Sequence, residues 1–202
     1  MQIDPSTLSA RDGYFLMISA IVPRPIAFVT TQGRDGRTNA APFSYFTGVS
    51  SSPPSLLICS GRRRDGLKDT ERNVLETREF VVNVVVDEMM SAVVIAGTDH
   101  PPEVSEIDLA GLQVAPGVKV AAPRVLSSPV SLECRLLQSI DVAGSAVIAG
   151  EVVWMHVRDD LLQASPQAAI PVIDPAKLKP IARLGGDLYA RLGEIFELPR
   201  RR

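Results

Sequence analysis

Residues 130–157 hold the pattern that most constrains the fold of this chain. Apolar and polar residues alternate from position 130 to position 136, which is the two-residue period of a strand that buries one face. The sequence Val-Ala-Gly-Ser at 142–145 supplies a tight turn, and a second apolar run follows over 146–157. We therefore expect a long antiparallel hairpin with one face in the core and the other face, including Glu133, in water.

Shorter strand patterns occur earlier in the chain, and turn residues bound each of them. The runs lie at 26–31, 44–50, 55–60 and 80–86, with turn chemistry at 33–36 and at Pro53 and Pro54. Helices are predicted over 8–21, 69–77, 88–96 and 187–196, whereas 99–128 and 163–180 are predicted to be irregular. Short strands, tight turns and covering helices favour a single mainly β domain over residues 1–202. They favour an antiparallel barrel and not a doubly wound sheet.

Charge and hydropathy argue against several classes of protein. The net charge of −2 over 202 residues lacks the basic footprint of a general nucleic-acid binder. No apolar run reaches the roughly 18 residues that a membrane-spanning helix needs, so we expect no membrane partner. Asp4 and Arg11 interrupt the region where a signal peptide would be apolar, which predicts a cytoplasmic protein.

The cysteines predict neither a metal site nor a reactive pair. Cys59 and Cys134 both sit within apolar strand-like runs, where we expect buried small hydrophobic side chains in a reducing compartment. The two cysteines and two histidines are too scattered for zinc spacing, so no metal is expected.

The loop at 61–70 is the most basic segment, with the sequence Gly-Arg-Arg-Arg-Asp-Gly-Leu-Lys-Asp-Thr. It is not a nucleotide-hydrolysing phosphate loop, because the lysine lies two residues after the second glycine. A helix that starts near Asp69 nevertheless offers unpaired amides, and we expect the Asp69 carboxylate to cap some of them. Lys68 adds a full charge, and one or two of the arginines at 62–64 can clamp a phosphate bidentately. The alternative is a solvated charged turn.

Two segments before this loop suit a flat ligand. The sequence Pro-Arg-Pro-Ile at 23–26 is stiff and extended because its prolines fix φ, although a plain strand entry with an exposed arginine is the alternative. Ala40 and Ala41 permit close approach of a planar ring to the backbone, and Asn39 and Ser44 can hydrogen-bond to its polar edge. The alternative is an ordinary barrel strand. A flat ring joined to an anionic tail describes flavin mononucleotide, FMN.

Three later residues are candidates for chemistry. His156 lies on the second long strand, either near a bound ligand or as a plain, partly exposed strand histidine. Arg183 and Tyr189 flank two glycines that relax the backbone, so they either approach a flat ligand or pin the last helix to the barrel. No G-x-S-x-G elbow is present, which fits a protein whose cofactor performs the chemistry.

These segments occur in the order of a known family. The chain resembles the flavin reductase-like, FMN-binding split-barrel family through PRPIAFVTT (23–31), NAAPFSYF (39–46), SGRRRDGLKDTERN (60–73), EFVVNVV (79–85), SPVSLEC (128–134), AGEVVWMHV (149–157) and RLGGDLY (183–189). The resemblance implies an antiparallel split β-barrel, FMN as cofactor, and a homodimer with the flavin near the subunit interface.

The resemblance also implies which residues meet the cofactor. Those expected to bind FMN are Arg24, Pro25, Ile26, Asn39, Ala40, Ala41, Pro42, Phe43, Ser44, Ser60, Arg62, Arg64, Lys68, Asp69 and Thr70. His156, Arg183 and Tyr189 are the candidates for catalysis.

The leading function implied by the resemblance is an NAD(P)H-dependent FMN reductase. It would transfer a hydride from nicotinamide C4 to flavin N5 and supply reduced flavin or electrons to a partner such as a monooxygenase. One alternative is a flavoredoxin-like electron carrier that never binds nicotinamide, and another is a non-enzymatic flavin-storage or sensing module. No ribose-binding acid or 2′-phosphate arginine is identifiable, so NADH and NADPH both stay open. FMN as bound cofactor and FMN as substrate also both stay open.

Overall fold

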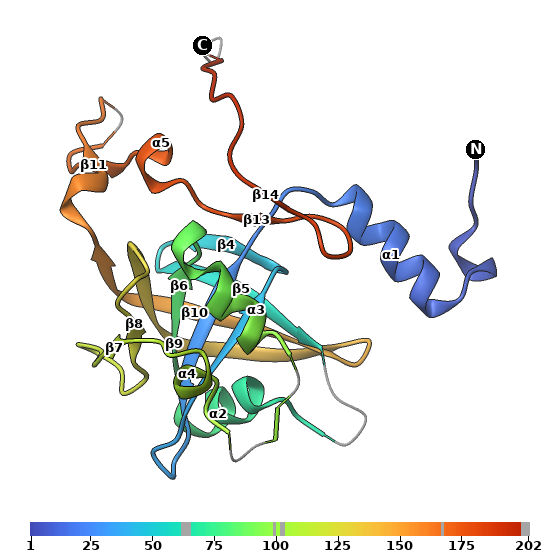
Figure 1. Ribbon diagram of the computed structural model, residues 1–202, viewed down its shortest axis with the longest axis horizontal. Helices are drawn as coiled ribbons and strands as arrows, with labels where there is room; N and C mark the ends of the chain where they lie inside the picture. The colour runs from blue at the N-terminus through green and yellow to red at the C-terminus, as the bar shows by residue number, and fades with distance from the viewer. Residues whose placement is uncertain (62–65, 99, 102–103, 167, 199–202) are drawn as a thin grey trace.

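The body of the protein is a strongly curved antiparallel sheet (Figure 1) with strand order β3-β2-β6-β9-β10-β5-β4. The computed structural model describes residues 1–61, 66–98, 100–101, 104–166 and 168–198. The seven strands are β2 (Ala27–Gln32), β3 (Thr38–Phe43), β4 (Phe46–Ser51), β5 (Pro54–Gly61), β6 (Glu79–Val84), β9 (Val130–Val142) and β10 (Ser145–Val157). The curvature brings β3 near β5, so the sheet wraps around an interior.

Both faces of this sheet are buried near β2. Val29 belongs to the interior core, which it shares with Phe80 of β6 and ten other buried side chains. Phe28 belongs to a second core on the outer face, together with Val93 of α3 (Met90–Ala96) and Ile107 of α4 (Glu106–Leu109). Because successive strand residues point to opposite faces, both faces of β2 are buried.

The long hairpin of β9 and β10 is confirmed, but its outer face is covered at Ser131 and Glu133, whereas Arg135 on the same face is exposed. Glu133 of β9 is fully buried, and its two carboxylate oxygens accept from the amides of Val118 at 2.7 Å and Lys119 at 2.6 Å. Residues 114–125, which carry the short strands β7 (Val114–Ala115) and β8 (Arg124–Val125), therefore fold over this face. The prediction of a solvated Glu133 is wrong because alternation within a strand does not reveal a covering loop from elsewhere in the chain.

The predicted helices near residues 8–21 and 69–77 are confirmed as α1 (Ala10–Ala20) and α2 (Asp69–Thr77). The predicted cap of α2 is wrong. Lys68 occupies the cap position without a side-chain capping bond, and Asp69 is the first helical residue, where its carboxylate pairs with Arg72.

The predicted helix at 187–196 is also wrong. Tyr189 instead belongs to β14 (Tyr189–Ala190), which pairs with β13 (Ala182–Arg183). Gly186 has a φ of 56° in the turn between them, a conformation that favours glycine. The pairing uses the backbone of 189–190, and residues 191–198 continue without regular structure.

The remaining elements are short. They are the 3₁₀ turns at Pro5–Thr7, Asp87–Met89 and Asp159–Leu161, the strands β1 (Arg24–Pro25), β11 (Leu162–Gln163) and β12 (Val172–Ile173), and the helix α5 (Pro175–Leu178). Helix α1 lies to one side of the body, and β1 leads from it into the sheet (Figure 1). Among the helices of the described residues, none has the length and apolar character that crossing a bilayer requires.

Substitution of Gly150 by alanine would test how tightly the interior core is packed. A Cβ at this position of β10 would lie 2.4 Å from Phe80 Cζ and 3.3 Å from Cys134 Cβ, so Gly150→Ala must displace core side chains. We expect a loss of about 1–3 kcal/mol in the free energy of unfolding, measured by denaturant titration. Gly48→Ala on β4 is the matched control, because its Cβ would meet nothing within 4 Å. Equal stabilities of the two variants would contradict this account of the core.

Candidate flavin site

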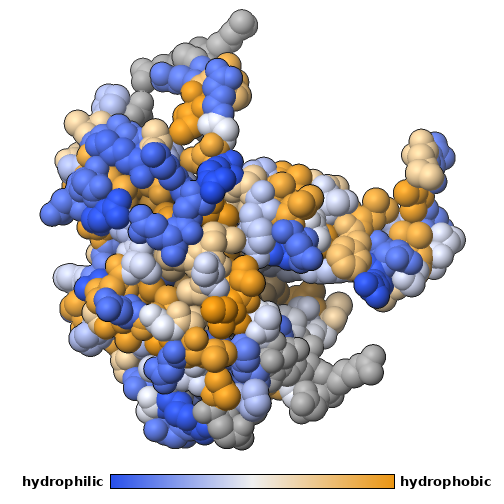
Figure 2. Space-filling view, viewed as in Figure 1, coloured by the Kyte–Doolittle hydropathy of each residue, from blue (hydrophilic) through white to orange (hydrophobic). Residues whose placement is uncertain are grey.

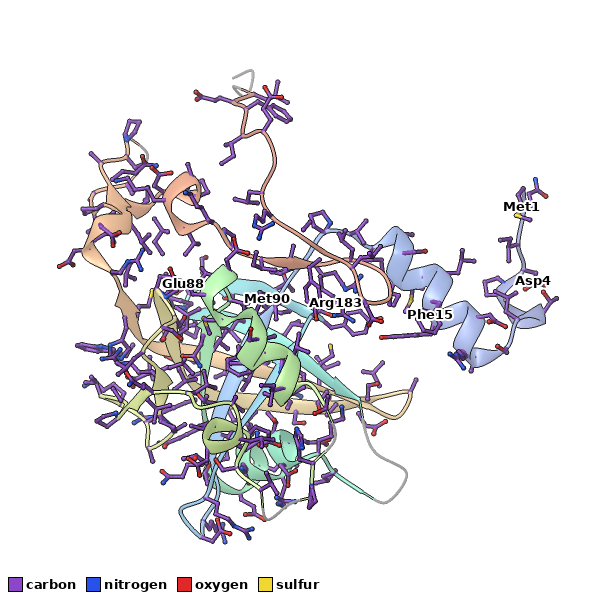
Figure 3. All side chains as sticks on the ribbon, in the orientation of Figure 1. Met1, Asp4, Phe15, Glu88, Met90 and Arg183 are labelled. Atoms are coloured by element: carbon purple, nitrogen blue, oxygen red, sulfur yellow. The ribbon has the colours of Figure 1, made fainter. Side chains whose placement is uncertain are left out.

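A cavity of about 580 Å³ opens between α1, the hairpin of β13 and β14, the end of β3, and α3. Figure 3 labels Phe15 and Arg183 where α1 and this hairpin come together. The cavity is lined by Tyr14, Phe15, Ile18, Arg24, Ile26, Pro42, Ser44, Val93, Val94, Gly97, Thr98, Arg183, Gly186, Asp187 and Tyr189. Predicted site residues that are far apart in the sequence, such as Arg24, Pro42 and Arg183, thus share one cavity.

Arg24 holds the walls of this cavity together. Its guanidinium is nearly fully buried and donates to the carbonyls of Ile18 at 2.6 Å, Ile21 at 2.7 Å and Leu184 at 2.7 Å. Its Nε donates to Ser44 Oγ at 3.3 Å. A guanidinium has five N–H groups, so four of them are engaged within the protein. Arg24 therefore fixes α1 and the β13–β14 hairpin against the end of β3.

Aromatic rings stand on both sides of the cavity. Arg183 stacks on the Tyr189 ring, with its guanidinium carbon 4.4 Å from the ring centroid, and lies 3.6 Å from Asp187. From α1, Tyr14 and Phe15 form an edge-to-face pair with ring centroids 5.7 Å apart. Aromatic faces and a cation suit a flat, polar-edged ring. Sequence reasoning missed Tyr14 and Phe15, because their spacing resembled the apolar face of an ordinary helix.

A second polar cluster lies at the start of α2. Thr70 is buried there, and its hydroxyl lies 2.9 Å from the amide group of Asn39 on β3. Asn73 of α2 donates to Thr31 Oγ1 at 3.0 Å. The amides and dipole of this nine-residue helix, with Lys68 beside them, can hold an anion.

Strand β3 joins the two clusters. Asn39 lies at the α2 end, whereas Pro42 and Ser44 line the cavity. An extended strand rises about 3.4 Å per residue, so Asn39 and Ser44 are separated by roughly 17 Å along the chain. This arrangement matches an elongated ligand that has a ring at one end and an anion at the other.

Other predicted residues lie along the same path, but several present their side chains to a core. Phe43 belongs to the interior core, against which Ala41 packs, and Ala40 belongs to the outer core. Because their side chains pack in the cores, these residues can offer a ligand only their backbone. Ser60 is fully buried at the end of β5. Pro25 is exposed on β1 beside Ala182, and Arg62 and Arg64 lie outside the described residues.

His156 does not line the cavity. It lies on β10, and its Nε2 is 2.6 Å from Oε1 of the buried Glu133. Burial alone would raise the pKa of Glu133, but hydrogen bonds from His156 and from the amides of Val118 and Lys119 lower it overall. Glu133 therefore holds His156 and the covering loop at once, a role that the sequence pattern did not indicate.

The comparisons with known proteins point to one family. Residues 18–173 match the model of the flavin reductase like domain. A flavin reductase (NADH) of Kitasatospora aureofaciens is 31% identical, over 69% of this chain and 69% of its own.

Two solved structures are similar over nearly the whole chain. Nitrilotriacetate monooxygenase component B from Bacillus cereus has a TM-score of 0.91 at 35% identity, covering 98% of each chain. The 2-nitrobenzoate 2-nitroreductase of Pseudomonas fluorescens has a TM-score of 0.89 at 30% identity, covering 100% of this chain and 96% of its own. The chain therefore belongs to the flavin reductase-like family, and its curved sheet is the split β-barrel of flavin reductases.

Proposed function

We propose that this protein is an NAD(P)H-dependent FMN reductase that supplies reduced flavin or electrons to a monooxygenase partner. The observation that carries the proposal is that β3 connects the start of α2, which Asn39 contacts, to the aromatic cavity, which Pro42 and Ser44 line. Similarity to a flavin reductase (NADH) supports the nicotinamide donor, and similarity to a monooxygenase component B supports the partner.

The residues present fit FMN at both ends. Lys68 and the first amides of α2 would hold the phosphate, while the backbone of 39–44 would follow the ring system. Arg183, Tyr189 and Phe15 would cover the ring and limit its contact with water. A bound flavin supplies two-electron chemistry between a nicotinamide and an acceptor, for which the protein provides placement and exclusion of competing reactions.

The activity test is oxidation of NADH and of NADPH by the purified protein, with and without added free FMN. Oxidation that needs added FMN supports a reductase that uses flavin as substrate, and oxidation without it supports a bound cofactor. No oxidation of either nucleotide, combined with reduction by a protein donor, would replace the proposal with an electron carrier. No reduction by any donor would leave a flavin-binding module.

A second candidate is reduction of a small aromatic acid within the same cavity. The combination of Tyr14, Phe15 and Tyr189 with the Arg183 guanidinium suits an aromatic carboxylate. Similarity to a 2-nitrobenzoate 2-nitroreductase supports it. Adding 2-nitrobenzoate to the NADH assay distinguishes the two candidates, because only the second predicts loss of the nitro compound at a rate proportional to enzyme concentration.

We also propose a homodimer, because much apolar surface of the described chain is uncovered. In α1, Ile18 is buried, whereas Leu16 and Met17 are each 46% exposed. Phe196 in the C-terminal segment is 72% exposed. Figure 2 shows apolar residues along the projecting α1 arm. A second copy covering these surfaces would form the commonest closed assembly, a twofold dimer.

The assembly prediction is a mass of about 43 kDa in solution by light scattering, twice the chain mass of 21.7 kDa. Leu16→Asp should shift the protein toward monomer, because it places a charge in the covered apolar surface. Gln163→Asp, which adds the same charge at an exposed position of β11, should leave the mass unchanged. A wild-type monomer at micromolar concentration would contradict the dimer.

The phosphate prediction concerns Lys68. Lys68→Ala should weaken FMN binding about tenfold to a hundredfold, because a lost charge-assisted hydrogen bond is worth roughly 1.5–3 kcal/mol. Riboflavin, which lacks the phosphate, should bind nearly as before, with both affinities measured by quenching of flavin fluorescence. Lys177→Ala, on the exposed side of α5, removes the same charge elsewhere and should change neither affinity. Equal losses for FMN and riboflavin would place the phosphate at another position.

The cavity prediction separates ligand contact from packing. Arg183→Ala and Tyr189→Phe should weaken FMN about two- to tenfold or slow NADH oxidation at a nearly unchanged melting temperature. Arg24→Lys is the contrasting variant, since it leaves buried carbonyls without their donors and should lower the melting temperature. Normal kinetics in both cavity variants, with lost stability, would mean that Arg183 and Tyr189 only pack the hairpin.

A further inference from the structure

A second cavity, the polar cavity, has a volume of about 350 Å³ and lies at the opposite end of β3 from the aromatic cavity. It is enclosed by α2, by the turn at 33–37 between β2 and β3, and by residues 104–106, where α4 begins. Asn39 lines it and also contacts Thr70 at the start of α2, so the polar cavity adjoins the proposed phosphate site. Its volume lies within the range of small-molecule sites in proteins.

Hydrogen bonds tie the walls of the polar cavity to one another. Arg34 of the turn donates to the Glu76 carbonyl of α2 at 3.3 Å. On another wall, the Asn39 amide is satisfied at both ends when its nitrogen donates to Glu106 Oε2 at 3.1 Å and its oxygen faces Thr70. The cavity is therefore built from connected elements and is not a gap between independent loops.

The walls suit a hydrogen-bonding ligand and not a flat apolar ring. Every side chain that lines the polar cavity is polar or charged except that of Val104. Asp69 at the start of α2 pairs with Arg72, and Asp35 of the turn pairs with Arg37 at 2.7 Å. An additional phosphate beside the start of α2 therefore meets an ion pair there and not an isolated carboxylate.

Arg34 places a planar cation at the far end of this cavity. Among the described residues its only partner is the Glu76 carbonyl, so four of the five N–H groups of its guanidinium are not engaged within the protein. Glu76 lies seven residues after Asp69, roughly 10 Å along the helix axis. Guanidinium planes stack on nucleobases, so an aromatic base at this distance from a phosphate can lie against Arg34.

Two hydroxyl groups on another wall suit a sugar. Thr38 Oγ1 and Ser105 Oγ both belong to residues that line the polar cavity, and they lie 3.4 Å apart. Hydrogen bonds between hydroxyls have a usual length of 2.7–2.8 Å, so this contact is weak. Each hydroxyl is both a donor and an acceptor and can bond to a ribose hydroxyl instead.

We propose that the polar cavity binds the adenylate of FAD, with its base against Arg34 and its ribose near the hydroxyls of Thr38 and Ser105. The inference rests on the proposed phosphate site, because FAD is FMN extended at its phosphate by AMP. Along β3, the aromatic cavity, the start of α2 and the polar cavity follow in the order in which FAD carries its ring, its first phosphate and its adenosine. The flavin supplied to a partner can then be FAD as well as FMN.

The experiment measures dissociation constants of FAD, FMN and riboflavin for the full chain freed of flavin, by isothermal titration calorimetry. We expect FAD to bind about tenfold more tightly than FMN, because the adenylate contacts exceed the cost of ordering it. Adenosine at high concentration should weaken the binding of FAD and leave that of FMN unchanged, because only FAD needs the polar cavity.

Two variants test the residues of the polar cavity. Val104→Trp places an indole in the cavity and should reduce the affinity for FAD to about that for FMN. Arg34→Ala removes the stacking cation and should weaken FAD about two- to fivefold. Neither should change the affinity for FMN. Arg158→Ala removes an exposed arginine that lines neither cavity, so as the matched control it should change no affinity.

The outcomes separate this inference from the proposed function. The same ratio of FAD to FMN affinity in wild type, Val104→Trp and Arg34→Ala would overturn the adenylate site. The FMN site would still stand in that case if Lys68→Ala weakens FMN and spares riboflavin. Equal losses of FMN and riboflavin in Lys68→Ala, or no binding of any flavin, would overturn the phosphate site and the adenylate site together.

Discussion

The burial of β2 on both faces is the constraint on which the rest of the structure depends. Val29 faces the interior and Phe28 faces α3 and α4, so the sheet has to be covered on its outside as well as closed around its inside. Covering the outer face brings polar groups out of water, and each then needs a partner. Asn83 shows how this is met, since its amide binds the Phe28 carbonyl at 3.0 Å and the Val125 amide at 2.9 Å.

The candidate site is a consequence of the same layering. Strand β3 is an edge strand of the sheet, with Ala40 in the outer core and Phe43 in the interior core. Its two ends meet different neighbours, α2 at Asn39 and the cavity at Ser44. Arg24 then fixes Ser44, α1 and the β13–β14 hairpin with a single buried side chain. A ring site and an anion site thus share one rigid strand, which holds a ligand of fixed length better than two independent loops would.

The parts of the fold that were predicted correctly are those that residues close together in the sequence determine, such as turns and helix starts. The turn at 142–145 was predictable from Gly144, which takes a positive φ of 79°, whereas Ala143, with a φ of 50°, gives no such signal in the sequence. The start of α2 near Asp69 was predicted at the right position, although the position before it, Lys68, makes no side-chain cap. Tyr189 was misplaced because its partner is the backbone of Arg183, and helical spacing of apolar residues carries no information about such pairing. Within the site, Arg24 was found by resemblance and Ser44 by its capacity for hydrogen bonds, whereas Glu106 lies in a segment without any periodic pattern.

The segment from 104 to 125, predicted to be irregular, couples regions that the sheet keeps apart. Near its start, Glu106 reaches Asn39 and through it Thr70 at the start of α2. Further along, the amides of Val118 and Lys119 bind Glu133, which also holds His156. A carboxylate that binds two loop amides and an imidazole is worth more as a unit than as separate contacts, because losing any one partner leaves a buried charge less well satisfied. The segment thus bridges two distant positions on the sheet, at one through its own acid, Glu106, and at the other through the amides that donate to Glu133 of β9.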